Sequence, residues 1–480
     1  MNCNPKEEQE LRSFGIRIRN GHRLYQYCDD LCYQSKNLYN VTNYFVRQVF
    51  SGIRKPERQR FPNEREAIET INSCIESLNK VREKTHQRKL SAGKESTLKE
   101  WKPLSEENRS LSYELLEGVF KTINQVDYRS IPSHSNQHVI KLVFQDWESF
   151  FHSIKDFQVD PSKYKGTPRP PRYAEKDGRK VAFLSNQTCV IKDSKYLKLP
   201  NTKQRLNIGK YIAGRGRLKQ VRVIPSKNHY TIEVVMAVEK SAPMRSGEPK
   251  RMLGIDLGVD NFATIVNNVG EAPLIVKGKV VKSINQYYNK QRAYYYSMLR
   301  TGFGTGQGKF TSERLDRLDR KRNDKIKDFL HKASYHVIEE AQRLQVDTIV
   351  IGKNSGFKEN VELRRKDKQT FIQIPYTSFI SMVEYKARHK GIRVIVREES
   401  YTSKASFLDN DPIPIYDKEN VEQQSFSGRR IKRGLYKSKD GTLINADVNG
   451  AANIIKKVVS NAFCEGDRGV VFTPRVLAIR

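Results

Sequence analysis

Two acidic residues stand in segments whose other residues predict burial. Asp256 lies in a short apolar run, residues 254–259, that predicts a strand, and Asp447 lies at the start of an apolar stretch, residues 446–454, that predicts a helix. An acid among residues that pack is costly unless it is paired or holds a cation. Carboxylate oxygens suit Mg²⁺ better than zinc. Two such ions about 4 Å apart activate water and stabilise the leaving oxygen of a phosphodiester, which is the chemistry that these acids predict.

A third acidic ligand is expected at the end of a later strand. The strand predicted at residues 347–354 ends in Gly-Lys-Asn without a carboxylate, whereas the strand at 391–397 leads directly into Glu398 and Glu399. We expect Glu399 to be the third ligand. The alternation of the strand by itself slightly favours Glu398, although a bulge at the strand end would void that preference.

Each acid also has a purely structural interpretation. Asp256 close to Gly258 is compatible with a turn, Asp447 with an acid that the helix dipole stabilises, and the glutamate pair with a solvated strand end. The order of the elements predicted from residue 252 onward favours chemistry: three strands, long helix, strand, helix, strand, long loop, helix. This is the order in ribonuclease H-like nucleases, which carry acids on the first strand, near a later strand and at the start of the last helix.

The composition predicts several modules and a polyanionic partner. The chain has 480 residues, with 87 Lys and Arg against 54 Asp and Glu, so its formal net charge is 87 − 54 = +33. Nucleic acid is the expected partner, and an acidic membrane surface is the alternative. Because the sequence has neither an apolar run long enough to span a bilayer nor a signal-peptide core, we expect no membrane partner and a cytoplasmic, nucleoid-associated prokaryotic protein.

The cysteines predict neither a disulfide framework nor a structural zinc. Six are scattered along the chain without a C-x-x-C pair, and Cys28 and Cys32, one helical turn apart, are interpreted as packing residues.

The first half of the chain predicts a small β-structure interrupted by helices. Residues 13–19 alternate as a half-buried strand, residues 23–157 have a helical pattern, and residues 180–238 predict short strands of a barrel or sandwich that the first strand completes. Two polar stretches within the helical part, residues 51–64 and 84–102, are expected to connect helices.

Three basic segments are candidates for phosphate contact. They are a proline-rich loop at 161–173, a long helix at 312–344 and a segment at 427–437. A cation ladder on a helix is often only a solvated face, but the overall charge favours phosphate contact. The candidate nucleic-acid-binding residues are Lys165, Arg169, Arg172, Arg320, Lys321, Arg322, Lys325, Arg429, Arg430 and Arg433. Aromatic residues of the helical part, including Tyr39, Tyr44 and Phe45, are expected mainly in the core, with base stacking as the alternative.

The chain resembles the transposon-associated TnpB (OrfB) proteins, relatives of the type V CRISPR effectors and of eukaryotic Fanzor. The segments that carry this resemblance are 36–40, 168–173, 254–258, 320–323, 331–334, 401–404 and 447–454. The resemblance implies an RNA-guided DNA endonuclease of the RuvC type, with two Mg²⁺ per site (Mn²⁺ is possible) held by Asp256, Glu399 and Asp447. The implied partners are a guide RNA derived from a transposon end, double-stranded target DNA and the displaced single strand.

The resemblance also implies a fold of mixed α/β and α+β domains. It predicts a β-barrel wedge domain at 1–22 and 158–250, an inserted helical recognition lobe at 23–157, an RNase H-like (RuvC) nuclease at 251–400 and 446–480, and a target-strand-loading insertion at 401–445. Glu399, two residues before Tyr401-Thr402-Ser403, resembles the rearranged glutamate of Fanzor and some TnpB proteins. The insertion departs from the family because it has no cysteine for the usual four-cysteine knuckle.

Two other functions remain open from the sequence. Some relatives have lost nuclease activity and act as guided repressors, against which the retained acids argue. A structure-selective nuclease or transposase that needs no guide is the third possibility.

Overall fold

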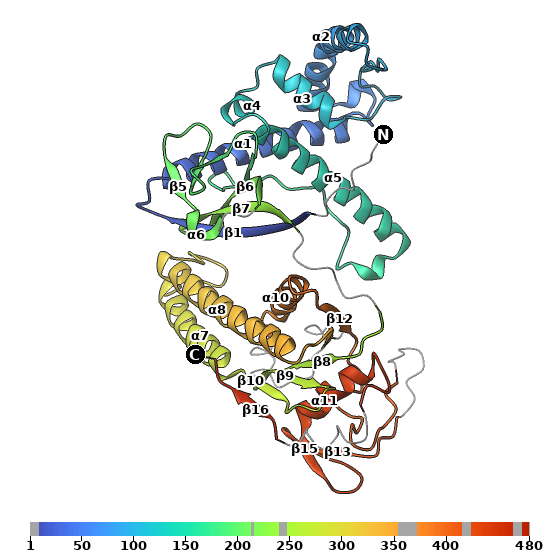
Figure 1. The fold of residues 1–480 in the computed structure, drawn as a ribbon. Coiled ribbons are helices and arrows are strands. Elements are labelled where there is room, and N and C mark those ends of the chain that lie inside the picture. Colours follow the sequence, from blue (N-terminus) through green and yellow to red (C-terminus); the bar gives the residue numbers. More distant parts are fainter. Residues whose placement is uncertain are drawn as a thin grey trace. The chain divides into compact units, whose positions relative to one another are not determined.

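The computed structural model describes residues 9–212, 216–239, 247–353, 372–414, 424–463 and 473–479. The chain divides into two compact units, residues 1–239 and 240–480, and both mix helices with sheets (Figure 1). Within the described ranges, no helix is both long and apolar enough to cross a bilayer.

The first unit begins with a strand, inserts a set of helices and then returns to strands. Its helices are α1 (Tyr25–Gly52), α2 (Pro62–Ser91), α3 (Tyr113–Thr122), α4 (Val126–Ser130), α5 (Ser135–Val159) and α6 (Gly209–Ile212), with short 3₁₀ turns at Glu57–Gln59 and Pro161–Lys163. Its strands are β1 (Gln9–Arg19), β2 (Ala182–Ser185), β3 (Val190–Lys192), β4 (Tyr196–Lys198), β5 (Arg205–Asn207), β6 (Arg217–Ser226) and β7 (His229–Glu239).

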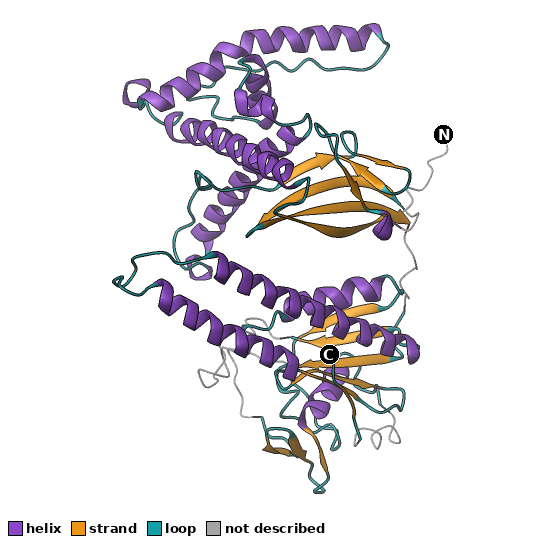
Figure 2. Ribbon diagram, turned by 90° about the vertical axis from the view of Figure 1, so that its left-hand side faces the viewer, coloured by secondary structure: helices purple, strands orange, loops and turns teal. Residues whose placement is uncertain are grey.

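The strands of the first unit form two antiparallel sheets. One has four strands in the order β1-β7-β6-β2, and the other has three in the order β3-β4-β5. β1 therefore pairs with β7 across the whole helical insertion, as the alternation at 13–19 predicted (Figure 2). Closure of these sheets into a barrel stays a prediction.

One apolar core joins the inserted helices to the larger sheet. It includes Leu31 of α1, Trp147 of α5, Val221 of β6 and Ile232 of β7, all almost fully buried. Cys28 belongs to the same core, and burial raises its pKa to about 12, so this thiol packs as an apolar group.

One predicted connector is helical in its first part. Residues 84–91 continue α2, whereas we expected a connection at 84–102. This part of the prediction was wrong because Lys, Glu, Gln and Arg sustain a solvent-exposed helix without any apolar periodicity.

The second unit is built on a mixed six-stranded sheet. Its helices are α7 (Lys279–Leu299), α8 (Glu313–Arg343), α10 (Tyr376–Arg388) and α11 (Ala446–Lys456). Its strands are β8 (Met252–Leu257), β9 (Asn261–Asn267), β10 (Leu274–Lys277), β11 (Thr348–Gly352), β12 (Arg393–Arg397), β13 (Arg429–Lys432), β14 (Leu435–Lys437), β15 (Leu443–Asn445) and β16 (Arg475–Leu477). The six-stranded sheet has the order β12-β11-β8-β9-β10-β16, and β13-β14-β15 form a separate antiparallel sheet.

The two faces of the six-stranded sheet pack against different helices. Leu253 and Ile255 of β8 lie in a core with α8 and α10, while Met252 lies in a core with Ile454 and Ile455 of α11. Successive side chains of a strand point to opposite faces, so Asp256 lies on the face that α11 covers. This alternation places an acid of β8 beside the start of α11.

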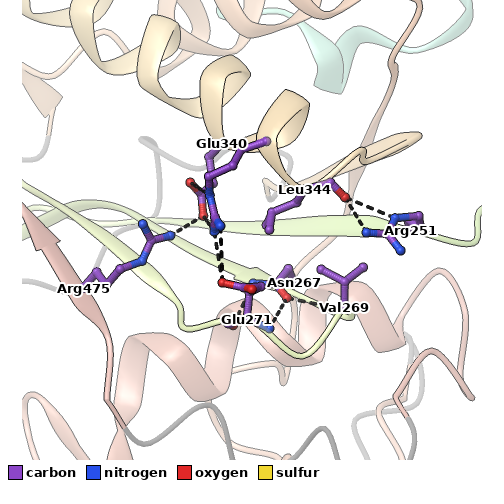
Figure 3. Close-up of polar contacts among 8 residues, drawn as sticks. Arg251, Asn267, Val269, Glu271, Glu340, Leu344 and Arg475 are labelled. Carbon is purple, nitrogen blue, oxygen red and sulfur yellow. Dashed lines mark hydrogen bonds and ion pairs between the residues drawn. The ribbon is translucent and has the colours of Figure 1, made fainter.

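The C-terminal strand β16 is tied to the end of α8 by a group of charged residues (Figure 3). Glu340, 7 % exposed, accepts hydrogen bonds from Arg343 at 2.9 and 3.1 Å and from Arg475 of β16. Arg343 also contacts Glu271 at 3.3 Å. Burial works against ionisation of Glu340, but the bonds from Arg343 and the charge of Arg475 hold its pKa below the usual value.

We expect Glu340→Gln to destabilise the protein by about 1–3 kcal/mol at neutral pH, because the two arginines lose a buried charged acceptor. A lowered carboxyl pKa stabilises the fold above the unfolded value of about 4.3 and ceases to do so as the pH falls, so the difference from wild type should shrink below about pH 4. Urea unfolding at several pH values measures this effect. Glu339→Gln, next along α8 and 48 % exposed at its side chain, is the matched control. Equal losses from both variants would contradict the prediction.

Candidate active site

Asp256 lies near the end of β8, against helix α11. The approach of the helix depends on Gly254, where an added Cβ would come within 2.3 Å of the carbonyl oxygen of Ala451. A Cβ at Gly450, one turn after the helix start, would lie 3.0 Å from Oδ2 of Asp256. The glycines therefore let the first turn of α11 and the Asp256 carboxylate share one small space.

Asp447 occupies the first turn of α11. Asn445 caps this helix, since its side chain accepts hydrogen bonds from the backbone N–H groups of Asp447 and Val448 at 2.9 and 3.2 Å. Asn261 of β9 donates its Nδ2 to Oδ2 of Asp447 at 2.7 Å, and Arg430 of β13 lies 3.4 Å from Oδ1. The Asp447 carboxylate is thereby oriented by Asn261 of the six-stranded sheet and by Arg430 of the β13-β14-β15 sheet.

The two adjacent glutamates after β12 have different environments. Glu398 accepts a hydrogen bond from Nζ of Lys457 at 2.6 Å and one from the backbone N–H of Ser400 at 2.6 Å. Lys457 is itself buried, with 5 % of its side chain exposed. Glu399 turns toward Asp256 and is close enough to change the pKa of that residue. Glu398 is therefore part of a structural ion pair, and Glu399 is the glutamate that joins the acids.

The pKa shifts report how closely these acids interact. Burial, followed by the charges of Glu399 and Asp447, raises the pKa of Asp256 well above its ordinary value, and Arg430 offsets only part of this. Burial, followed by the charge of Glu398, raises the pKa of Glu399 to about 7. The pKa of Tyr376 is also raised, by burial and then by Asp256 and Glu399. Buried carboxylates with such shifts are characteristic of functional sites.

The donor set suits a hard divalent cation, although the acids are not gathered around one position. Within the described parts of the chain, no three His, Cys, Asp or Glu side chains are drawn together into a metal-binding group. Asp447 is engaged by Asn261 and Arg430 instead. A cation would offset the repulsion that raises the pKa of Asp256, so the chemistry of the residues fits Mg²⁺ once Asp447 turns away from Arg430.

Two family models match the part of the chain that contains these acids. Residues 233–358 match the OrfB_IS605 model, described as a probable transposase, and residues 376–454 match the Cas12f1-like TNB domain. A TnpB-like protein, ORF457 of Acidianus two-tailed virus, is 25 % identical over 229 residues, 47 % of this chain and 46 % of that protein. These matched parts of the chain are similar to the TnpB family. Asp256 lies in the first matched segment, and Glu399 and Asp447 lie in the second.

A second curated protein that is similar to this chain is CRISPR-associated. The endodeoxyribonuclease Cas12f2 of Micrarchaeota archaeon (strain CG1_02_47_40) is 25 % identical over 219 residues, which are 44 % of this chain and 37 % of that protein. The chain thus spans less than half the length of the curated relatives it matches. Among solved structures, a Cas12f1-sgRNA-target DNA complex covers 92 % of this chain and 98 % of its own, at 12 % identity and a TM-score of 0.30.

Strand β11 ends at Gly352, without a carboxylate. A Cβ on Gly352 would lie 2.7 Å from Oε2 of Glu399 and 2.5 Å from Cδ1 of Ile454. The Glu399 carboxylate therefore fills the space directly above the end of β11. A side chain at position 352 and the carboxylate of Glu399 would therefore clash.

We expect Gly352→Ala to lower the cleavage rate by about 10- to 100-fold, because the added methyl group pushes the Glu399 carboxylate out of place. Gly434→Ala is the control, since a Cβ there meets nothing within 4 Å. Cleavage kinetics of the two folded variants measure the effect, and wild-type rates for Gly352→Ala would show that the site tolerates a displaced Glu399.

Two asparagines of α11 were missed by the sequence analysis. Asn449 and Asn453 are fully buried, and their side-chain amides both donate to the carbonyl oxygen of Ala405 at 2.8 Å. Asn453 also donates to the carbonyl oxygen of Thr402 at 2.9 Å. These bonds hold the loop that follows Glu399 against the helix that carries Asp447. The sequence pattern that could have indicated them is two asparagines, four residues apart, on an otherwise apolar helix.

The candidate cations of the second unit differ in whether their side chains bond to other parts of the protein or face solvent. Arg322 is half-buried and donates to Asn285 Oδ1 at 2.9 Å and to the carbonyl oxygen of Gln373 at 2.8 Å. Lys321 and Lys325 are exposed. Arg322 thus has a structural role, while the two lysines face solvent.

The basic loop of the first unit is anchored by α1. The side chain of Asn43 donates to the carbonyl oxygen of Pro171 at 3.1 Å, and Asn40 exchanges two hydrogen bonds with Ala174, at 2.8 and 3.0 Å. Lys36 donates to the carbonyl oxygen of Lys176 at 2.6 Å. Two segments that carried the family resemblance, 36–40 and 168–173, therefore lie at the two sides of one hydrogen-bonded loop. The candidate cations of this loop, Lys165, Arg169 and Arg172, are exposed.

Of the aromatic residues considered for base stacking, Tyr39 belongs to the core. It is 2 % exposed, and its hydroxyl donates to Asp146 at 2.7 Å. Tyr44 and Phe45 are half-buried and meet edge to face, with ring centroids 5.7 Å apart.

Proposed function

We propose that this chain is an RNA-guided DNA endonuclease that hydrolyses phosphodiester bonds at Asp256, Glu399 and Asp447. The observation that carries the proposal is the burial of Asp256 near Glu399 and Asp447, which raises its pKa and makes its ionised form costly unless a cation is bound. The similarity to TnpB proteins supports the same reaction class.

The residues of the site have distinct parts in this proposal. Mg²⁺, with two ions per site and Mn²⁺ as a substitute, would supply an activated water and neutralise charge on the scissile phosphate. Asp256 and Glu399 are held by the packed sheet and offer oxygens that need little reordering. Asn261, which accepts from Lys277 at 2.9 Å while donating to Asp447, orients the third carboxylate. Arg430 stabilises Asp447 until that carboxylate is released.

The proposed partners are a guide RNA derived from a transposon end, double-stranded target DNA and the displaced single strand. The net charge of +33 supports the binding of polyanions along extended surfaces. We assign residues 1–22 and 158–250 to the wedge, 23–157 to the recognition lobe, and 251–400 and 446–480 to the RuvC nuclease, with the insertion at 401–445. Within this assignment, Lys165, Arg169 and Arg172 contact nucleic acid from the loop that α1 anchors.

The experiment that tests the proposal uses the full-length protein purified with its bound RNA. A plasmid that contains the sequence matched by that RNA is expected to be cut in Mg²⁺ and left intact in EDTA. Target binding without cleavage in either Mg²⁺ or Mn²⁺ would favour the guided repressor. Cleavage by protein that carries no RNA would favour a nuclease that needs no guide.

We expect alanine replacement of Arg429, Arg430 and Arg433 to lower the rate of cleavage by about tenfold or more, because exposed cations beside the acids are lost to the substrate strand. Replacement of three exposed cations of α2, Lys84, Arg88 and Lys89, is the control for the loss of three positive charges. Cleavage at several salt concentrations measures the effect, and unchanged rates in the triple variant would refute a contact between this segment and DNA.

A further inference from the structure

Helices α7 and α8 form an antiparallel pair (Figures 1 and 2). A groove of about 540 Å³ lies between them. This volume is within the range of about 300–1,000 Å³ that is usual for small-molecule sites. Tyr287 and Tyr295 line it from α7, eight residues and therefore about two turns apart, and Lys321 and Lys325 line it from α8 at a spacing of one turn. All of these residues belong to the second unit.

The charge of the groove has one sign. Its lining contains five Arg and Lys side chains and three Tyr side chains, and no Asp or Glu among the residues described there. The cations nearest solvent, Arg314, Arg317, Lys321 and Lys325, are all exposed. Such a composition attracts an anion that also has an aromatic face, because phosphate binds cations and bases stack on tyrosine.

The floor of the groove is held in place by other contacts. The Tyr288 hydroxyl donates to Asp319 at 2.8 Å, and the Arg322 guanidinium lies 5.4 Å from the centre of the Tyr288 ring while bonded to Asn285 and Gln373. By contrast, Tyr287 is 63 % exposed. The floor of the groove is thus preorganised, and a tyrosine on its rim is accessible. Because the floor is already ordered, binding a ligand there has a lower entropic cost.

We propose that this groove binds an unpaired nucleotide of a single-stranded polynucleotide. The base stacks on Tyr287, and the neighbouring phosphates lie against Lys321 and Lys325. A base within a duplex keeps its faces covered, so stacking selects an unpaired strand. This inference rests on the proposed function. It adds where one nucleic-acid contact lies and that the strand bound there is single-stranded. The same chemistry is offered by guide RNA and by displaced DNA, and the experiment distinguishes them.

The test is photochemical crosslinking of the full-length Asp256→Ala protein in EDTA, so that no strand is cut. The probes are single strands of about 16 nucleotides that carry halogenated uracil, one of RNA and one of DNA. Crosslinked peptides are identified by mass spectrometry. We expect a crosslink at Tyr287. The affinity for the strand should fall about 5- to 100-fold in Tyr287→Ala, while Tyr287→Phe should retain the affinity.

Tyr294→Ala is the matched control, because Tyr294 is on the same helix and 58 % exposed but does not line the groove. Glutamine at Lys321 and Lys325 should reduce the salt dependence of the crosslink at Tyr287, by about 0.7 in the logarithmic slope for each lysine that contacts a phosphate. A crosslink with only one probe identifies the strand. Strand binding without a crosslink on α7, or equal losses in Tyr287→Ala and Tyr294→Ala, would overturn the inference. Failure to bind either strand would instead count against the proposed function.

Discussion

Asp256→Asn is expected to reduce Mg²⁺-dependent cleavage by at least about 10³-fold, because several kcal/mol of charge stabilisation depend on this carboxylate. The variant should remain folded. Burial and the charges of Glu399 and Asp447 raise the pKa of Asp256, so its ionised form costs free energy in the folded state once the pH exceeds the unfolded value. At neutral pH in EDTA, Asp256→Asn should therefore melt at or above the wild-type temperature. Cleavage rates and melting curves measured on the same preparation separate lost chemistry from lost folding.

Asp260→Asn is the control for this variant. Asp260 lies four residues further along the chain and is paired with Lys282 at 2.5 Å and Arg433 at 3.5 Å, with 49 % of its side chain exposed. Exposed ion pairs are worth about 1 kcal/mol or less, so its cleavage rate should stay within about fivefold of wild type. Similar losses in both variants would indicate a general effect of charge and not a catalytic Asp256.

The second large effect is expected from Glu399→Gln, which should reduce cleavage by at least about 10²-fold while the protein stays folded. Its carboxylate lies in the space above Gly352 and interacts with Asp256, so its charge is required where the acids meet. In addition, Mg²⁺ should raise the melting temperature of the wild type more than that of this variant, because one ligand has lost its charge. This second readout does not depend on activity.

Glu398→Gln should have the opposite profile. The change leaves the buried ammonium of Lys457 with an uncharged acceptor, which should cost about 1–3 kcal/mol of stability. Below its melting temperature, the variant should cut DNA within about fivefold of wild type, and Mg²⁺ should stabilise it normally. Loss of cleavage in Glu398→Gln with retention in Glu399→Gln would exchange the roles of the two residues.

The positions of Asp256 and Asp447 were predictable because the residues around each one are apolar and indicate a buried strand or helix. All five neighbours of Asp256 in residues 254–259 are glycine or apolar, and Asp447 begins an apolar helix. The order of elements from residue 252 onward was also predictable, and the structure has β8, β9, β10, the α7–α8 pair, β11, α10, β12 and α11 in that order. The three-residue strand β16 was not predicted, because a segment so short has no readable period.

The choice between Glu398 and Glu399 shows where sequence reasoning ends. The alternation of the strand slightly favoured Glu398, but β12 ends at Arg397, so its period no longer directs the two residues that follow. The chain then turns, and Tyr401 has a φ of 66°. Lys457, which engages Glu398, lies 59 positions away along the chain. No local pattern indicates such a partner.

The sequence by itself determined the reaction class that we propose, because a strand acid, a helix-start acid and a charge of +33 are properties of composition and short-range order. Only the tertiary structure showed which glutamate lies near Asp256 and which cations bond to other parts of the protein. It also showed that tyrosines of α7 face lysines of α8. These features depend on side chains brought together from distant segments. Packing against β11 and α11, and not periodicity, determines where each one points.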